Sequence, residues 1–101
     1  MIVAIVRFSL PKALSLAEAT AVYEASAPNY QQVDGLRRKH YLLGDDGRVG
    51  GGVYLWDSRE QAEALYAEAW RARISARYGA PPTVEYFESP VTVDAETITV
   101  G

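Results

Sequence analysis

The sequence predicts an α+β fold of the ferredoxin-like class, a four-stranded antiparallel sheet with both helices on one face. Two observations carry this prediction. Four runs rich in β-branched and aromatic residues surround two segments of helical periodicity, in the order β-α-β-β-α-β. The sequence Gly-Asp-Asp-Gly at residues 44–47 separates the two central runs, and Asp-Gly pairs close tight hairpins. We expect a single domain over residues 1–101.

The composition narrows the classes of function. The chain has no cysteine, which excludes disulfides, thiolate metal sites and a cysteine nucleophile. A net charge of −3 disfavours nucleic acid as a partner, because phosphate binding needs a basic face. The run Arg37-Arg38-Lys39 is the only basic cluster, and we interpret it as a solvated or paired segment. No apolar run is long enough for a membrane span and the first residues do not form a signal-peptide pattern, so we expect a cytoplasmic protein.

The first half of the chain predicts a strand and a helix. Residues 2–8 are apolar in both alternating sets, which indicates a strand buried on both faces. Ser15 and Glu18 form a capping box, in which each side chain satisfies a backbone donor of the first helical turn. Helical spacing then predicts a helix from about Leu16 to Ala25, and Pro28 limits its length.

A hairpin and a long second helix follow. Residues 35–43 and 48–56 predict two antiparallel strands joined by the turn at 44–47. Ser58 caps the second helix, and Gly79 ends it. The apolar stripe of this helix consists of Ala62, Leu65, Tyr66, Ala69, Trp70, Ile74 and Tyr78.

Two features predict a partner chain. The helices leave one sheet face open, and this face includes Val3 and Ile5. A large apolar face usually marks an interface, so we predict a homodimer in which two sheets stack face to face. Residues 83–93 predict the fourth strand, with an edge position or a bend at Pro90, and residues 96–100 favour an added strand that pairs within this chain or with another.

His40, the only histidine, is the first candidate for chemistry. It is the only side chain with an unperturbed pKa near neutrality. Its two interpretations are a general base or hydrogen-bond donor to a ligand, and a surface or interface histidine. One histidine without suitably spaced carboxylates forms no ligand set, so the sequence predicts no metal site. No cofactor-binding motif is present either, and we expect no cofactor.

The glycine-led strand at residues 48–56 is the second candidate. Gly50, Gly52, Tyr54 and Trp56 share one of its faces. This pattern fits a notch with an aromatic wall for a ligand, and it fits equally a core that needs glycine for close packing. The two interpretations stay open at this point.

The stripe of the second helix is the third candidate. Tyr66 and Trp70 place polar groups among apolar neighbours, and a buried hydroxyl or indole N–H needs a partner. Arg73 borders the stripe. Its guanidinium either extends to solvent or anchors an oxyanion in a pocket.

These residues carry a resemblance to a known family. The stretch from Gly35 to Tyr66 and the following segment Trp70–Ile74 resemble the YdhR-like family of mono-oxygenases, within the dimeric α+β barrel superfamily. The resemblance runs from Ile2 to about Val93. Its most recognisable residues are Gly35, Lys39, Gly51, Gly52, Tyr54, Leu55 and Trp56, together with Ala72, Arg73 and Ile74 on the second helix.

The resemblance implies a dimer of ferredoxin-like subunits, each with a pocket between its sheet and helices. Related barrel enzymes are cofactor-independent oxygenases that remove a proton from an electron-rich phenol or anthrone, whose carbanion then reduces O₂. Carried over to this chain, His40 or a tyrosine takes the proton, and Tyr54 and Arg73 hold the oxyanion in a dry aromatic pocket. The implied substrate-binding residues are Gly52, Trp56, Tyr66, Trp70 and Tyr86.

A rival function belongs to another class. Small α+β barrel dimers are also similar to non-enzymatic proteins that bind a small molecule or act in stress responses. A haem-degrading relative would require a histidine on a helix, whereas His40 lies on a predicted strand. Oxygen uptake with phenols, without added flavin or metal, separates the oxygenase from the binding module.

Overall fold

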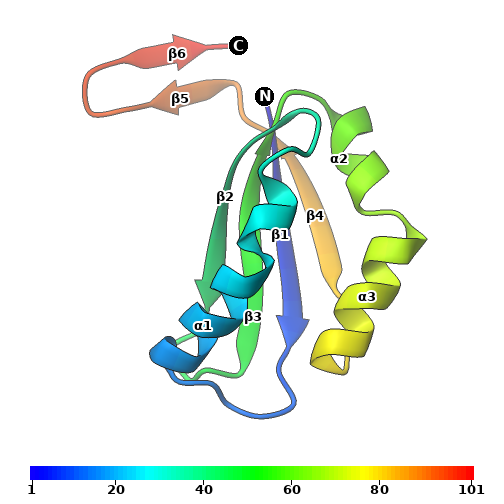
Figure 1. Cartoon of the computed structure of the whole chain (residues 1–101). Helices are drawn as coiled ribbons and strands as arrows, with labels where there is room; N and C mark the ends of the chain where they lie inside the picture. The colour runs from blue at the N-terminus through cyan, green and yellow to red at the C-terminus, as the bar shows by residue number, and fades with distance from the viewer.

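The computed structural model describes residues 1–101 and confirms the predicted α+β architecture (Figure 1). The main sheet has the strand order β2-β3-β1-β4, and all its neighbours are antiparallel. Its helices all lie on one face of the sheet (Figure 1). The strands are β1 (Ile2–Ser9), β2 (Leu36–Leu43), β3 (Val49–Trp56) and β4 (Thr83–Glu88), and the helices are α1 (Leu16–Ser26), α2 (Arg59–Leu65) and α3 (Glu68–Tyr78).

The β2–β3 hairpin sets which side chains face the helices. It closes at the predicted turn, where Gly47 has a φ of 73°. The register places Lys39 opposite Tyr54, which is 2% exposed and belongs to the core. Because side chains alternate along a strand, Lys39 faces the helices and the next residue, His40, faces the opposite side.

The core lies between the sheet and the helices. On β1, Ala4 and Val6 are buried beneath the helices, while Val3 and Ile5 lie half-buried on the other face. The strand is therefore apolar on both faces, as predicted, and this chain covers only one of them. The buried residues are Ile2, Ala4, Val6, Phe8, Leu10, Ala19, Tyr23, Tyr54, Trp56, Ala62, Tyr66, Trp70 and Tyr78.

Helix α1 begins at the predicted capping box. The Ser15 hydroxyl accepts from the Glu18 N–H at 3.1 Å, and a Glu18 carboxylate oxygen accepts from the Ser15 N–H at 3.0 Å. The chain then tightens into a 3₁₀ turn, η1 (Ala27–Tyr30), because Pro28 cannot donate a backbone hydrogen bond but fits a helical start.

No helix in the structure is long and apolar enough to span a membrane.

The second helix differs from the prediction of one continuous helix. It is divided into α2 and α3 by a break at Tyr66 and Ala67. The Tyr66 carbonyl accepts a hydrogen bond from Arg71 Nε at 2.8 Å, which satisfies an acceptor exposed by the break. No glycine or proline marks this position, and the apolar spacing continues across it, so the sequence pattern did not reveal the break.

The C-terminal segment also differs in detail. The predicted strand at 83–93 bends at Ser89 and Pro90, which separates β4 from β5 (Val91–Val93). Strand β5 pairs with β6 (Ile98–Val100) in a two-stranded sheet of its own. Figure 1 shows this hairpin extending away from one end of the main sheet. The tail therefore pairs with its own chain.

Candidate active site

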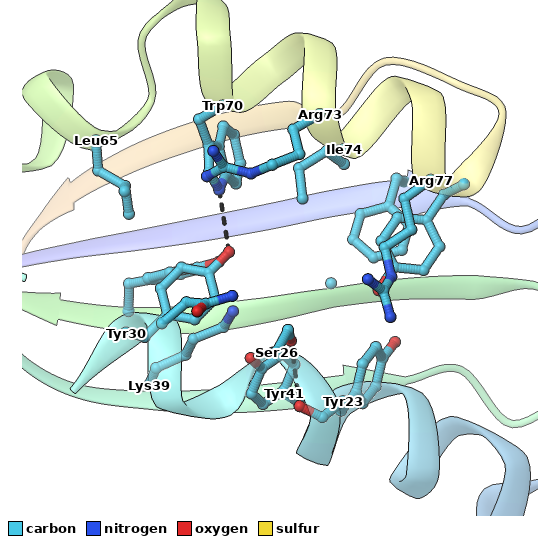
Figure 2. Close-up of a pocket in the computed structure, with 15 residues that line it drawn as sticks. Tyr23, Ser26, Tyr30, Lys39, Tyr41, Leu65, Trp70, Arg73, Ile74 and Arg77 are labelled. Carbon is cyan, nitrogen blue, oxygen red and sulfur yellow. Dashed lines mark hydrogen bonds between the residues drawn. The ribbon is translucent and has the colours of Figure 1, made fainter.

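A cavity of about 110 Å³ lies between α1 and α3, with the sheet as its floor (Figure 2). One wall comes from α1 and η1, and the other comes from α3 and the end of α2. The fold thus leaves a hollow between sheet and helices, where the family resemblance implies a pocket. The lining residues are Phe8, Tyr23, Ser26, Asn29, Tyr30, Lys39, Tyr41, Gly51, Tyr54, Leu65, Trp70, Arg73, Ile74, Arg77 and Tyr78.

Phenol and indole groups connect the two walls across the cavity. The Trp70 indole N–H donates to the Tyr30 hydroxyl at 3.1 Å, which ties α3 to η1 (dashed line in Figure 2). On the other side, the Tyr41 hydroxyl and the Ser26 hydroxyl are 2.7 Å apart and share a hydrogen bond. The polar tips of these aromatic side chains therefore have partners, and their rings form an apolar surface around the cavity.

Lys39 is the ionisable group at the floor of the cavity. Its Nζ lies 3.4 Å from the centre of the Tyr30 ring, 3.7 Å from that of Tyr41 and 4.7 Å from that of Tyr54. No carboxylate pairs with Lys39. The two ion pairs of the chain are Arg37–Asp57 and Arg59–Glu63. Burial lowers the pKa of Lys39 to about 7.

The tyrosine rings around Lys39 hold the ammonium form less well than a carboxylate would. Ring faces attract a cation, at about 0.5–2 kcal/mol per contact, but they accept no strong hydrogen bond. A large fraction of the amine is therefore neutral at pH 7 and has a free electron pair beside the cavity. A base with a pKa near the working pH is efficient in proton transfer.

Burial has the opposite effect on the phenols. Tyr54 is 2% exposed, and burial raises the pKa of its hydroxyl well above the usual range, with a further contribution from Tyr30. The pKa values of Tyr23 and Tyr41 are also raised by burial. These phenols stay protonated at neutral pH and donate hydrogen bonds, so they are poor bases. One apolar environment thus produces a neutral amine and neutral phenols side by side.

The structure brings three of the predicted site residues together. Tyr54, Trp70 and Arg73 line the cavity. His40 does not, because it lies exposed on the opposite face of the sheet. No group of three or more His, Asp or Glu side chains is close enough to hold a metal ion.

The other predicted site residues pack beside the cavity and do not line it. Trp56 is fully buried, and its indole N–H donates to the Tyr66 hydroxyl at 3.1 Å. The Tyr86 ring lies under the guanidinium of Arg59, and the centre of the ring is 4.3 Å from Arg59 Cζ. These residues form the aromatic layer at the side of the cavity under α2.

The glycines of β3 serve the packing of neighbouring residues. A Cβ atom at Gly52 would lie 3.1 Å from Tyr54 Cε1 and 3.3 Å from Lys39 Cε. A Cβ atom at Gly50 would lie 2.6 Å from the Tyr23 hydroxyl. The space above these glycines is filled by the chain itself, which favours the close-packing interpretation, and the cavity lies beside them toward α1 and α3.

Lys39 was not predicted as a site residue. The basic run at Arg37-Arg38-Lys39 divides into three environments, since Arg37 pairs with Asp57 at 2.7 Å, Arg38 is exposed and Lys39 faces inward. A signal was present in the alternation of β2, where Lys39 shares a face with Tyr41. A lysine on the apolar face of a half-buried strand indicates a functional amine or a long stem that extends to solvent.

Comparisons with known proteins give matches among solved structures only. No family model and no curated protein matches the chain. A monooxygenase from the gene ActVA-Orf6 of Streptomyces coelicolor, solved in complex with Nanaomycin D, is 14% identical with a TM-score of 0.68, over 94% of this chain and 92% of that one.

Two further solved structures are similar. An antibiotic biosynthesis monooxygenase from Nitrosomonas europaea, named as such provisionally, is 22% identical with a TM-score of 0.60, over 88% of this chain and 98% of that one. The protein Rv0793 from Mycobacterium tuberculosis is 17% identical with a TM-score of 0.59, over 96% of this chain and all of that one. The chain therefore shares the fold of monooxygenases of this type.

Proposed function

We propose that the protein is a monooxygenase that needs no cofactor and acts on a phenolic substrate in the cavity. The observation that carries this proposal is the Lys39 amine, which lies among three tyrosine rings without a carboxylate partner. The shared fold with the monooxygenases above supports it. The resemblance of residues 35–74 to YdhR-like mono-oxygenases supports the same class of reaction.

The substrate itself supplies the electrons in this proposal. Lys39 takes a proton from a phenol, and the resulting anion has carbanion character at the ring carbon opposite the oxygen. In its keto tautomer that carbon is a CH₂ group, which O₂ converts to C=O with release of H₂O. One oxygen atom enters the product, and the other leaves as water with the two hydrogen atoms of the CH₂ group. The phenol thus becomes a quinone, and no external reductant is consumed.

Two tyrosines support the reaction from the floor and wall of the cavity. The Tyr54 hydroxyl stays protonated and donates a hydrogen bond to the developing oxyanion. Tyr30 and Trp70 join the two walls, which keeps water away from the reacting carbon. In this proposal Lys39 is the base and Tyr54 the hydrogen-bond donor, and the walls joined by Tyr30 and Trp70 exclude water.

Oxygen uptake tests this function. Chelator-treated protein is supplied with hydroxyarenes that have a free para position, and dissolved O₂ is followed with an electrode. We expect one O₂ consumed per quinone formed, without hydrogen peroxide. Tyr54→Phe should reduce kcat about 100-fold, because one oxyanion donor is lost. His40→Ala should leave the rate unchanged, because His40 lies on the other face of the sheet.

Other outcomes would contradict the proposal. Tight binding of hydroxyarenes without O₂ consumption across the panel would identify a binding module, the rival function. A loss of uptake in His40→Ala, with Tyr54→Phe unaffected, would move the chemistry to the open face of the sheet.

We also propose that two chains pair through the open face of the sheet. This face carries Val3, Ile5, Val53 and Leu55, which are half-buried in a single chain. Leu42 is 40% exposed on the same face. A contiguous exposed apolar patch usually marks an interface, and a second copy offers an identical patch.

The C-terminal hairpin supports the same pairing. Its register places Val91 opposite Val100 and Val93 opposite Ile98, so four apolar side chains share one face. All four are more than half exposed. An isolated two-stranded hairpin is marginally stable in water, so its apolar face is expected to pack on the partner chain.

Leu42→Asp is expected to convert the dimer to a monomer. The charge would lie within the proposed interface, on the edge strand β2, whereas in a single chain it faces water. Light scattering with size-exclusion chromatography measures the mass at micromolar concentration. Leu16→Asp, the same change at a residue that is 74% exposed on α1, should leave the dimer intact. A monomeric wild-type protein would refute the pairing.

A further inference from the structure

The charged groups around the cavity have one sign. Among its lining residues, Lys39, Arg73 and Arg77 carry basic groups, and no aspartate or glutamate is present. The chain as a whole is acidic, with a net charge of −3. Two charged arginines and a partly protonated lysine around one hollow therefore run against the average charge of the protein. A cavity with this lining favours a negative ligand, because an apolar wall strengthens the attraction.

The two arginines of the cavity have no counter-ion in the chain. Arg73 and Arg77 lie one helical turn apart on α3, a spacing at which like charges destabilise a helix. The ion pairs of the chain involve other arginines, Arg37 and Arg59. Figure 2 shows the Arg73 side chain running along α3 toward Trp70, and the Arg77 side chain directed toward the opposite wall. Both side chains are exposed, so water solvates them in the free chain and a negative ligand would displace that water.

The size of the cavity limits the ligand. A volume of about 110 Å³ is smaller than the cavity of about 150 Å³ that holds one benzene molecule in an apolar protein core. The free space therefore admits no more than a single ring, and any substituent extends toward the arginines. Arginine binds carboxylates with two parallel hydrogen bonds, which makes a carboxylate the best match for that position.

We propose that the substrate is a single-ring hydroxyaryl carboxylate, whose carboxylate is bound by Arg73 and Arg77 while its phenol lies at Lys39 and Tyr54. This inference relies on the proposed function only for placing the phenol at Lys39. It reassigns Arg73 from the oxyanion, which Tyr54 serves, to the carboxylate. It also gives Arg77, which the sequence did not single out, a role in choosing the substrate.

Calorimetry with 3-hydroxybenzoate and its neutral analogue 3-hydroxybenzamide tests the proposal. We expect the acid to bind at least 10-fold more tightly than the amide at low salt, with a smaller ratio at high salt. The double variant R73Q/R77Q should bring the ratio near 1. Arg48→Gln, which changes an exposed arginine near the β2–β3 turn, should leave the ratio unchanged. Equal binding of acid and amide, or a preference that survives R73Q/R77Q, would overturn the proposal.

An indole signal locates the bound acid. The chain has two tryptophans, and only Trp70 lines the cavity. In a ¹⁵N-resolved NMR titration with 3-hydroxybenzoate, the Trp70 indole resonance should shift more than that of Trp56, and the opposite result would place the acid elsewhere. Acid-selective binding without oxygen uptake would refute the oxygenase and keep this inference. Oxygen uptake together with a preference for the amide would support the oxygenase and refute this inference.

Discussion

Lys39→Met is expected to abolish oxygen uptake and, at the same time, to stabilise the folded protein. The amine is the base of the proposed reaction, so its removal stops proton transfer. Its pKa is lowered from 10.5 to about 7 because the folded state desolvates the ammonium, and methionine keeps the linear stem without that cost. We expect the free energy of unfolding to rise by roughly 2–4 kcal/mol at pH 7.

The stability difference should depend on pH in a defined direction. Between about pH 7 and 10.5 the unfolded chain binds the Lys39 proton and the folded chain does not, so the wild-type free energy of unfolding rises with pH. Below pH 7 both states hold the proton, and this contribution to the slope vanishes. The advantage of Lys39→Met should therefore shrink between pH 7 and 9. In the wild type, oxygen uptake should rise through about pH 7 as the amine loses its proton.

Urea denaturation at pH 6, 7, 8 and 9 measures the stability change, and an oxygen electrode measures the activity. The only other lysine is the exposed Lys12, and Lys12→Met should change neither quantity. If Lys39→Met were less stable than the wild type at pH 7, the amine would be charged and well paired in the folded state. The proposed base would then be wrong.

Gly51→Ala is expected to destabilise the protein by about 3 kcal/mol or more. A Cβ atom at this position would collide with the Val6 carbonyl oxygen and lie 2.9 Å from the Val6 carbonyl carbon. Strand β1 cannot move away, because it pairs with β3 on one side and β4 on the other. A domain has only about 5–15 kcal/mol of stability, so this single methyl group removes a large share.

Thermal or chemical unfolding followed by circular dichroism measures this effect. Gly44→Ala is the matched control, because its Cβ atom would make contacts of 3.5 Å or longer and its φ is not positive. We expect that variant to lie within about 0.5 kcal/mol of the wild type. A Gly51→Ala protein of wild-type stability would show that β1 and β3 are less tightly paired than the register implies.

The fold could be read from the sequence because its signals are local. Residues 2–8 alternate in two apolar sets, and the Gly-Asp-Asp-Gly turn fixes the hairpin that follows. The break at Tyr66 could not be predicted from the sequence, because it depends on how the Tyr66 and Trp70 rings pack in the core. The centres of these two rings lie 4.8 Å apart across the break. The bend at Pro90 was predicted, but the pairing of β5 with β6 required the path of the chain in space.

The site was harder to predict, because it depends on which strand residues lie opposite one another. The histidine is the obvious base in a list of residue types, and it lies on the wrong face for this cavity. Lys39 looked like part of a solvated basic run, and only its register with Tyr54 places it among the rings. Tyr54 and Trp70 line the cavity because they follow the apolar periodicity of their elements, and Arg73 lines it from the border of the helical stripe.

Strand β2 contributes to the cavity on one face and to the proposed subunit contact on the other. His40 and Lys39 are consecutive residues, so one stretch of backbone carries the proposed interface on one side and the proposed base on the other. A shift of one residue in this strand would exchange the two side chains. The proposed assembly and the proposed reactivity would then be lost together.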